Sequence, residues 1–271
     1  MLSNKKIAFV GAGSMAESII AGLLANELLT PDQIIATNKS NQERLSYLEQ
    51  EYRIQTTSDK ATAVSEADVI VLAMKPVHVA EGIAEIRSFT SEQQLFISVL
   101  AGISTKHISE LLGHEGGVIR TMPNTSAKVG ASASAITAGE HASQDQLKLT
   151  ATLFEAIGTV TIVPEDKIDA VTGLAGSGPA YIYYLVEAME QAASEIGLEK
   201  EEANQLIVQT LAGASKRLQS TSKTAVELYK EVMSPGGTTE AGLKVLAEND
   251  FQETMKKAIL RAVERSKELG N

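Results

Sequence analysis

The chain has 271 residues, of which 44% are hydrophobic and 21% charged, the usual balance of a folded globular protein. Its net charge of −10, from 24 basic and 34 acidic side chains, argues against nucleic acid as a partner, because an acidic surface repels phosphate backbones. The lack of cysteine excludes disulfides, thiolate nucleophiles and zinc–thiolate sites, and the 4 histidines have no metal-ligand spacing.

The N-terminal segment has no sign of a targeting or membrane sequence. Lys5 and Lys6 precede the apolar run Ile7–Val10, but a glycine ends that run at once. The run is too short for the core of a signal peptide and for a bilayer span. We therefore expect a cytoplasmic protein that does not bind a membrane.

The first part of the chain alternates short apolar runs with helical patterns. The β-α-β alternation predicts an α/β fold with a Rossmann-type, doubly wound parallel sheet. Helices are expected at Met15–Asn26, Asn41–Glu51 and Gln144–Ile157. Strands are expected where β-branched residues lie between turn residues, at Lys6–Val10, Gln33–Thr37, Val69–Ala73, Leu95–Leu100, Val118–Met122, Ser132–Thr137 and Thr159–Val163.

The pattern changes after Pro164, and apolar residues then recur only at helical spacing. We predict a dinucleotide-binding domain at residues 1–164 and an all-α domain at residues 165–271. Because a helical domain of this size has little core of its own, we expect its apolar stripes to pack against a second copy of the chain in a homodimer. Packing of these stripes within one chain is the alternative.

A glycine-rich loop lies between the first strand and the first helix. Gly11-Ala12-Gly13-Ser14-Met15-Ala16 is a GxGxxA motif, in which the first glycine allows a tight turn and the second a close approach to pyrophosphate. The following helix N-terminus offers N–H groups to phosphates. In this strand–helix context the motif predicts a dinucleotide cofactor bound by Gly11–Met15, although a turn built only for packing is possible.

The end of the second strand indicates which cofactor is bound. NAD-specific enzymes usually carry Asp or Glu there, whereas this chain has Asn38, Lys39 and Ser40, with Arg44 one helical turn later. An amide, a hydroxyl and a cation bind a 2′-phosphate that a carboxylate would repel. We therefore expect NADPH, with NADH weaker, unless Lys39 and Arg44 are only solvated surface charges.

Two more strands end at the same edge of the sheet, where doubly wound folds bind ligands. The segments Ala73-Met74-Lys75-Pro76 and Val99-Leu100-Ala101 follow these strands and are expected to bind the nicotinamide half of the cofactor. Lys75 is a candidate catalytic residue, and a plain surface lysine is the alternative.

Two glycine-rich segments in the helical part are candidate anion sites. Gly176-Ser177-Gly178-Pro179 precedes a long helix that Ser177 can cap. Ser234-Pro235-Gly236-Gly237-Thr238-Thr239 precedes another helix and offers backbone N–H groups and hydroxyls at its N-terminus. Two consecutive glycines are more than a cap requires, so we expect the second segment to bind a carboxylate or phosphate.

The two glycine-rich segments of the helical part resemble motifs of the pyrroline-5-carboxylate reductase family. The GxGxxA motif, Ala73–Pro76 and Arg120-Thr121-Met122-Pro123-Asn124-Thr125 also resemble that family. All of them occur in the family's order, and the resemblance covers nearly the whole chain. Ser234–Thr239 is the most specific element. The resemblance implies a Rossmann domain followed by a helical dimerisation domain, and assembly into dimers and often decamers. It also implies NAD(P)H-dependent reduction of 1-pyrroline-5-carboxylate to L-proline, a step of proline biosynthesis.

The resemblance further implies roles for individual residues. Thr239 would lie near the ring nitrogen of the substrate and act as a catalytic residue. The substrate pocket would form between the helical domain of one subunit and the Rossmann domain of its partner. The substrate carboxylate would be bound by Ser234, Gly236, Gly237, Thr238 and Thr239.

The chain departs from the family pattern at three positions. Met233 stands where a small or hydroxyl residue is usual, Ser126 where proline is common, and Lys60 where asparagine is frequent near the adenosine. The change at Lys60 bears on cofactor preference. None of the three lies in the expected carboxylate loop.

The expected chemistry needs few special side chains. The iminium form of a cyclic imine already accepts hydride, so the enzyme must chiefly hold its reactants in place. A β-hydroxyacid dehydrogenase is one alternative, but it typically needs a lysine and an asparagine on a helix where Gly178–Ile196 has neither. A non-catalytic NADP-sensing protein is another, although it has no reason to keep a second anion site.

Overall fold

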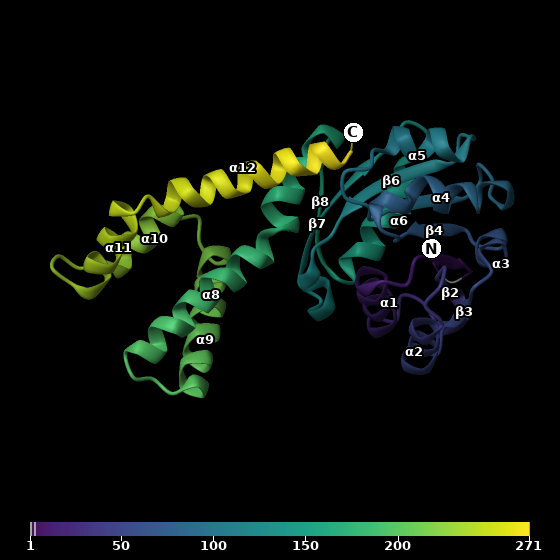
Figure 1. Ribbon diagram of the computed structural model, residues 1–271. Helices are drawn as coiled ribbons and strands as arrows, with labels where there is room; N and C mark the ends of the chain where they lie inside the picture. The colour runs from purple at the N-terminus through teal and green to yellow at the C-terminus, as the bar shows by residue number, and fades with distance from the viewer. Residues whose placement is uncertain (1, 3, 271) are drawn as a thin grey trace. The chain divides into compact units, whose positions relative to one another are not determined.

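The computed structural model describes Leu2 and residues 4–270. Its N-terminal part contains an eight-stranded sheet with the strand order β3-β2-β1-β4-β5-β6-β7-β8 (Figure 1). The strands are β1 (Ile7–Val10), β2 (Ile34–Thr37), β3 (Gln55–Thr57), β4 (Val69–Leu72), β5 (Leu95–Ser98), β6 (Gly117–Met122), β7 (Ser132–Ala138) and β8 (Gly158–Ile162).

The sheet has the topology of a Rossmann fold. Strands β1 to β6 pair in parallel, and β1 has β2 on one side and β4 on the other. The order of the strands reverses at β1 and β4, which is where such sheets bind ligands. The predicted fold class is confirmed, although β7 runs antiparallel to β6 and β8 is parallel to β7.

Helices cover both faces of the sheet because successive strand side chains point to opposite faces. Ile7 and Phe9 of β1 are buried against one set of helices, and Ala8 and Val10 against the other. The first set is α1 (Ser14–Ala25), α2 (Gln42–Tyr52) and α6 (Gln144–Glu155), and the second is α3 (Lys60–Ser65), α4 (Val79–Ala84) and α5 (Thr105–Leu112).

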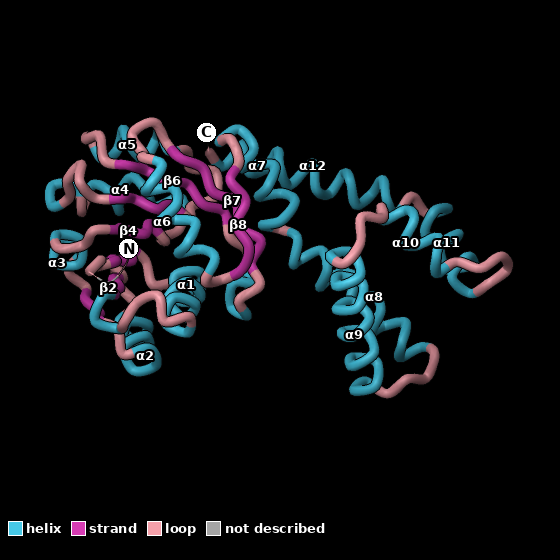
Figure 2. Tube along the Cα trace, turned by 180° about the vertical axis from the view of Figure 1, so that it is seen from behind, coloured by secondary structure: helices cyan, strands magenta, loops and turns pink. Residues whose placement is uncertain are grey.

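After β8 the described chain contains helices and no strand, as expected, and Figure 2 shows strands only as far as β8. Among the described residues, none of the helices combines the length and hydropathy that crossing a bilayer requires. The remaining helices are α7 (Ile168–Val171), α8 (Gly178–Glu195), α9 (Lys200–Gln219), α10 (Ala225–Val232), α11 (Thr238–Glu248) and α12 (Phe251–Leu269).

The chain forms two compact units. Unit 1 comprises Met1–Pro179 and Arg261–Asn271, and unit 2 comprises Ala180–Leu260. Helix α12 contributes to both units, since the division falls between residues 260 and 261. These two units do not coincide with the two domains predicted from the sequence, whose boundary lies at residue 164. The domains 1–164 and 165–271 remain a proposal about which part of the chain binds the cofactor and which forms the dimer.

Unit 2 buries very little of its own apolar surface. All of residues 180–260 are described, and the buried hydrophobic residues among them are Ala193, Ala203 and Ile207. Large side chains stay exposed on several helices, such as Tyr184 at 78% and Val232 at 70%. An apolar surface of this extent is typical of a protein–protein interface.

Candidate active site

The glycine loop is held tightly between two strand ends. Gly11 has φ +114°, and a Cβ there would lie 2.5 Å from the carbonyl carbon of Ala73. Its amide donates a 3.0 Å hydrogen bond to the carbonyl of Thr37 at the end of β2. Only glycine fits this position, because both the conformation and the close approach exclude a side chain.

The start of α1 leaves room for a ligand. Gly13 precedes the helix, and a Cβ built on it would have no atom within 4 Å. The first N–H groups of a helix have no partner within it, so they are available to phosphate oxygens in this open space. Ala16 is fully buried, which lets α1 pack closely on the sheet. These residues fit the pyrophosphate of a dinucleotide.

Arg44 ties α2 to the glycine loop. Its Nε donates a 2.7 Å hydrogen bond to the carbonyl of Ala12, and its guanidinium pairs with Glu17 on α1. Burial raises the pKa of Glu17, but the hydrogen bonds from Arg44, Tyr52 and Tyr47 outweigh it and hold that pKa below its usual value. Arg44 therefore supports the loop, a role that the sequence did not indicate.

The corner beyond β2 carries two cations. Lys39 forms an ion pair with Glu81, and this carboxylate raises the lysine's pKa. Lys60 pairs with Glu85. Asn38 accepts hydrogen bonds from the amides of the next turn at 3.1 and 3.2 Å. A hollow of about 420 Å³ adjoins this corner, lined by Lys39, Ser58, Asp59, Lys60, Ala61, Glu85 and Phe89.

The segments after β4 and β5 leave the sheet side by side. The amide of Ala73 bonds to the carbonyl of Val10, and the amide of Val99 to that of Leu72, at 2.9 and 3.1 Å. Lys75 is exposed just after this point, whereas the side chain of Leu100 is buried in the core. Leu100 can therefore contact a ligand only through its backbone.

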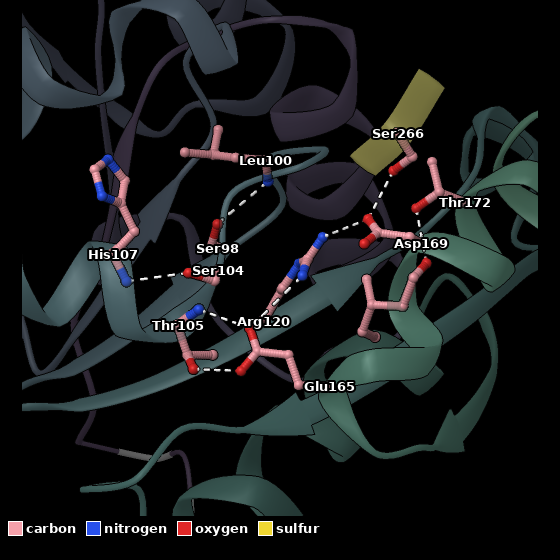
Figure 3. A network of polar contacts seen from close by, with 11 residues as sticks. Ser98, Leu100, Ser104, Thr105, His107, Arg120, Glu165, Asp169, Thr172 and Ser266 are labelled. Carbon is pink, nitrogen blue, oxygen red and sulfur yellow. Dashed lines mark hydrogen bonds and ion pairs between the residues drawn. The ribbon is translucent and has the colours of Figure 1, made fainter. Parts of the chain in front are cut away.

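A buried polar network lies behind the loop that follows β5 (Figure 3). Arg120 of β6, whose side chain is 4% exposed, faces Glu165 at 3.6 Å and Asp169 at 3.1 Å. Glu165 accepts 2.7 and 2.6 Å hydrogen bonds from the amide and hydroxyl of Thr105. Asp169 accepts a 2.8 Å hydrogen bond from Ser266 of α12.

Unit 2 contains the segment Ser234–Thr239. Gly237 caps the N-terminus of α11, and its amide closes a turn on the carbonyl of Ser234 at 2.9 Å. The amide of Gly236 donates a 2.7 Å hydrogen bond to Glu240. A groove of about 1020 Å³ adjoins the turn; its lining includes Tyr229, Met233, Gly236, Gly237, Glu240 and Phe251.

The local backbone conformation explains one of the two glycines in this segment. Gly236 has φ +69°, and a Cβ on Gly237 would lie 2.4 Å from Oγ of Ser234. The left-handed conformation alone accounts for glycine at position 236, so that glycine is no sign of a ligand. The free N–H groups at the start of α11 remain a feature that suits an anion.

The prediction of an anion site at Gly176–Pro179 is wrong. The chain is already helical there, because α7 continues through a π-helical turn at Thr172–Gly176 into α8. Ser177 has φ −83° and ψ −14°, and its amide bonds to the carbonyl of Thr172 at 2.9 Å. It does not cap a helix, and this position has no free helix N-terminus.

Comparison with known proteins identifies the family. Residues 165–269 match the family model described as pyrroline-5-carboxylate reductase dimerisation, and residues 6–102 match the model of coenzyme F420-dependent NADP oxidoreductases. Pyrroline-5-carboxylate reductase 2 of Bacillus subtilis is 46% identical over 265 residues, which cover 98% of this chain and 95% of the relative. The chain belongs to the pyrroline-5-carboxylate reductase family.

Solved structures of the family have the same fold. The pyrroline-5-carboxylate reductase of Coxiella burnetii has a TM-score of 0.89 at 38% identity, covering 99% of this chain and 100% of that one. The Plasmodium falciparum enzyme with NADP bound has a TM-score of 0.92 at 25% identity, covering both chains fully, at 100% each. The likeness therefore extends through both units of this family member.

Sequence reasoning missed the network around Arg120. A single arginine within an apolar, buried strand was a usable signal, since a buried cation needs carboxylate partners. Its partners, Glu165 and Asp169, lie 45 and 49 positions later in the chain, and the sequence alone did not indicate which carboxylates would pair with it.

Proposed function

We propose that the protein reduces 1-pyrroline-5-carboxylate to L-proline with a hydride from NADPH. The main support is the 46% identity to a pyrroline-5-carboxylate reductase along nearly the full length of both chains. The free N–H groups at the N-termini of α1 and α11 add to this, because one set suits a pyrophosphate and the other a carboxylate.

We assign the cofactor to unit 1. Gly11–Met15 would hold the pyrophosphate, Asn38 and Lys39 the 2′-phosphate, and the segments 73–76 and 99–101 the nicotinamide half. NADPH supplies the hydride when bound. The likeness to a structure that contains NADP supports this choice over NADH, as does the lack of an acidic residue at Asn38.

We assign the substrate to the segment Ser234–Thr239. Backbone amides at the start of α11 would hold its carboxylate, and the hydroxyl of Thr239 would hydrogen-bond the ring nitrogen as it becomes an amine. Positioning of this kind is the main contribution that an easily reduced imine requires. Lys75, exposed beyond β4, is a second candidate for contact with the reacting groups.

We further propose a cytoplasmic homodimer formed through residues 165–271, with decamers as a higher assembly. The exposed apolar side chains of unit 2 support the dimer, as does the description of the matching family model. Sedimentation of the purified protein tests it, and a stable, active monomer would contradict it.

The activity is tested by following NADPH oxidation with 1-pyrroline-5-carboxylate, its six-membered homologue and a β-hydroxyacid with NADP. We expect turnover with the five-membered imine. Turnover of the hydroxyacid alone would favour a dehydrogenase, although α8 lacks the lysine and asparagine of that class. NADPH binding without any turnover would indicate a sensing protein.

A further inference from the structure

The loop that follows β5 is fixed from the sheet side by hydrogen bonds between side-chain hydroxyls and backbone groups. The hydroxyl of Thr121 donates a 2.9 Å hydrogen bond to the carbonyl of Ser98, and the amide of Leu100 bonds to Oγ of Ser98 at 3.3 Å. These contacts hold the start of the loop. Its far end is the N-terminus of α5, where Thr105 lies.

Arg120 contacts the far end of this loop indirectly, through the carboxylate of Glu165. Glu165 accepts two hydrogen bonds from Thr105, and Arg120 faces the same carboxylate from within the sheet. A buried guanidinium stays in place only where carboxylates compensate its charge. Among the described residues its Nε has no hydrogen-bond partner, and its terminal nitrogens face the carboxylates of Glu165 and Asp169.

The end of α12 completes the arrangement. The hydroxyl of Ser266, which is 3% exposed, donates to the same Oδ1 of Asp169 that Arg120 contacts (Figure 3). One turn later Gly270 lies against the loop, since a Cβ on Gly270 would be 2.1 Å from the carbonyl oxygen of Gly102. All these residues belong to unit 1.

We propose that Ser266, Asp169 and Arg120 are positioning residues for the segment Val99–Gly102, so that the end of α12 sets the affinity for the nicotinamide half of the cofactor. The inference rests on the proposed function, which assigns this segment to the nicotinamide ribose. The adenosine half is assigned to the ends of β1 and β2. It should therefore bind independently of Ser266.

The test uses Ser266→Ala in the full chain, with the exposed neighbour Lys267→Ala as matched control. Affinities are measured for NADPH and for adenosine 2′,5′-bisphosphate, which lacks the nicotinamide. Because the lost hydrogen bond acts on the cofactor only through Asp169 and Arg120, we expect a smaller effect than loss of a direct contact, about a three- to tenfold rise in the dissociation constant of NADPH. The bisphosphate should bind within twofold of wild type, and Lys267→Ala should change neither constant.

If Ser266 has a purely structural role, Ser266→Ala should lower the melting temperature and leave both affinities unchanged, or weaken both equally. Either result would overturn the proposal. If Ser266→Ala does not fold, Asp169→Asn replaces it, since the amide oxygen still accepts from Ser266 while the ion pair with Arg120 is lost. It should also weaken NADPH selectively. A wild-type protein that binds NADPH but does not reduce the imine would refute the proposed function alone.

Discussion

The carboxylate of Glu240 accepts a 2.7 Å hydrogen bond from the backbone amide of Gly236. An acidic side chain of α11 thus contacts the very turn that we propose for the substrate carboxylate. It holds the left-handed conformation of Gly236 in place, but it also puts a negative charge beside an anion site. These two effects can be separated by substitution.

Glu240→Gln keeps an oxygen acceptor for Gly236 and removes the charge. We expect the KM for the imine to fall by about two- to fivefold, the modest effect typical of an exposed charge. Glu240→Ala also removes the acceptor, so the turn loosens and KM should rise. Steady-state kinetics at saturating NADPH measures both. A higher KM for Glu240→Gln would mean that the charge helps to bind substrate.

Thr239→Ala should damage reduction of the imine and spare the dinucleotide. Loss of a hydrogen bond to a charged amine costs about 1.5–3 kcal/mol, or roughly ten- to a hundredfold in kcat/KM. Thr239→Ser should restore most of the activity because it restores the hydroxyl. The dissociation constant of NADPH, from fluorescence titration, should not change in either variant. Equal losses in both measurements would instead indicate a folding defect.

Cofactor choice should depend on the ion pair between Lys39 and Glu81. Lys39→Glu should lower kcat/KM for NADPH by about tenfold and leave NADH nearly unaffected, because only NADPH carries the 2′-phosphate. Glu81→Gln frees the lysine and should improve NADPH binding by about two- to fivefold. A wild-type preference for NADH would refute the assignment of this corner.

Stability should depend on the pair formed by Glu17 and Arg44. The pKa of Glu17 is held below its usual value of 4.5, so the pair stabilises the fold above that pH and loses its effect as the pH falls through the folded-state pKa. Glu17→Gln should cost about 1–2 kcal/mol at pH 7. The difference from wild type should shrink below about pH 4, whereas Glu140→Gln, in an exposed turn, should show no difference at either pH. Urea unfolding at both pH values measures this.

Most of the sheet could be predicted because β1, β4, β5 and β6 are fully buried, largely apolar runs. The prediction of Val69–Ala73 differs from β4 by one residue. The strand β3 was missed because Gln55–Thr57 is polar and exists only through its pairing with β2 at the edge. The short connection between Met122 and Ser132 was a usable sign of the antiparallel β7, since a parallel crossover needs about a dozen residues or more.

The site was less predictable because glycine and serine have several uses. The same Gly-Ser-Gly-Pro letters suit a helix cap or a helix that passes through, and only the π-helical turn before Ser177 decides between them. A Cβ on Gly237 would lie close to Oγ of Ser234, so local packing as well as a ligand can account for this glycine. The contact of Ser266 with Asp169 joins residues 97 positions apart, which no local pattern encodes.

Unit 1 is discontinuous in the chain, and this affects the order in which it can fold. Residues 261–270 are synthesised only after the whole of unit 2 has been made. During translation the sheet and its covering helices can therefore form early, but the hydrogen bond between Ser266 and Asp169 can form only after residue 266 has been synthesised. A nascent chain that lacks residues 261–270 would therefore lack a contact that we propose holds the loop beside the nicotinamide site, so we expect it to reach its full affinity for the cofactor only once this segment has joined unit 1.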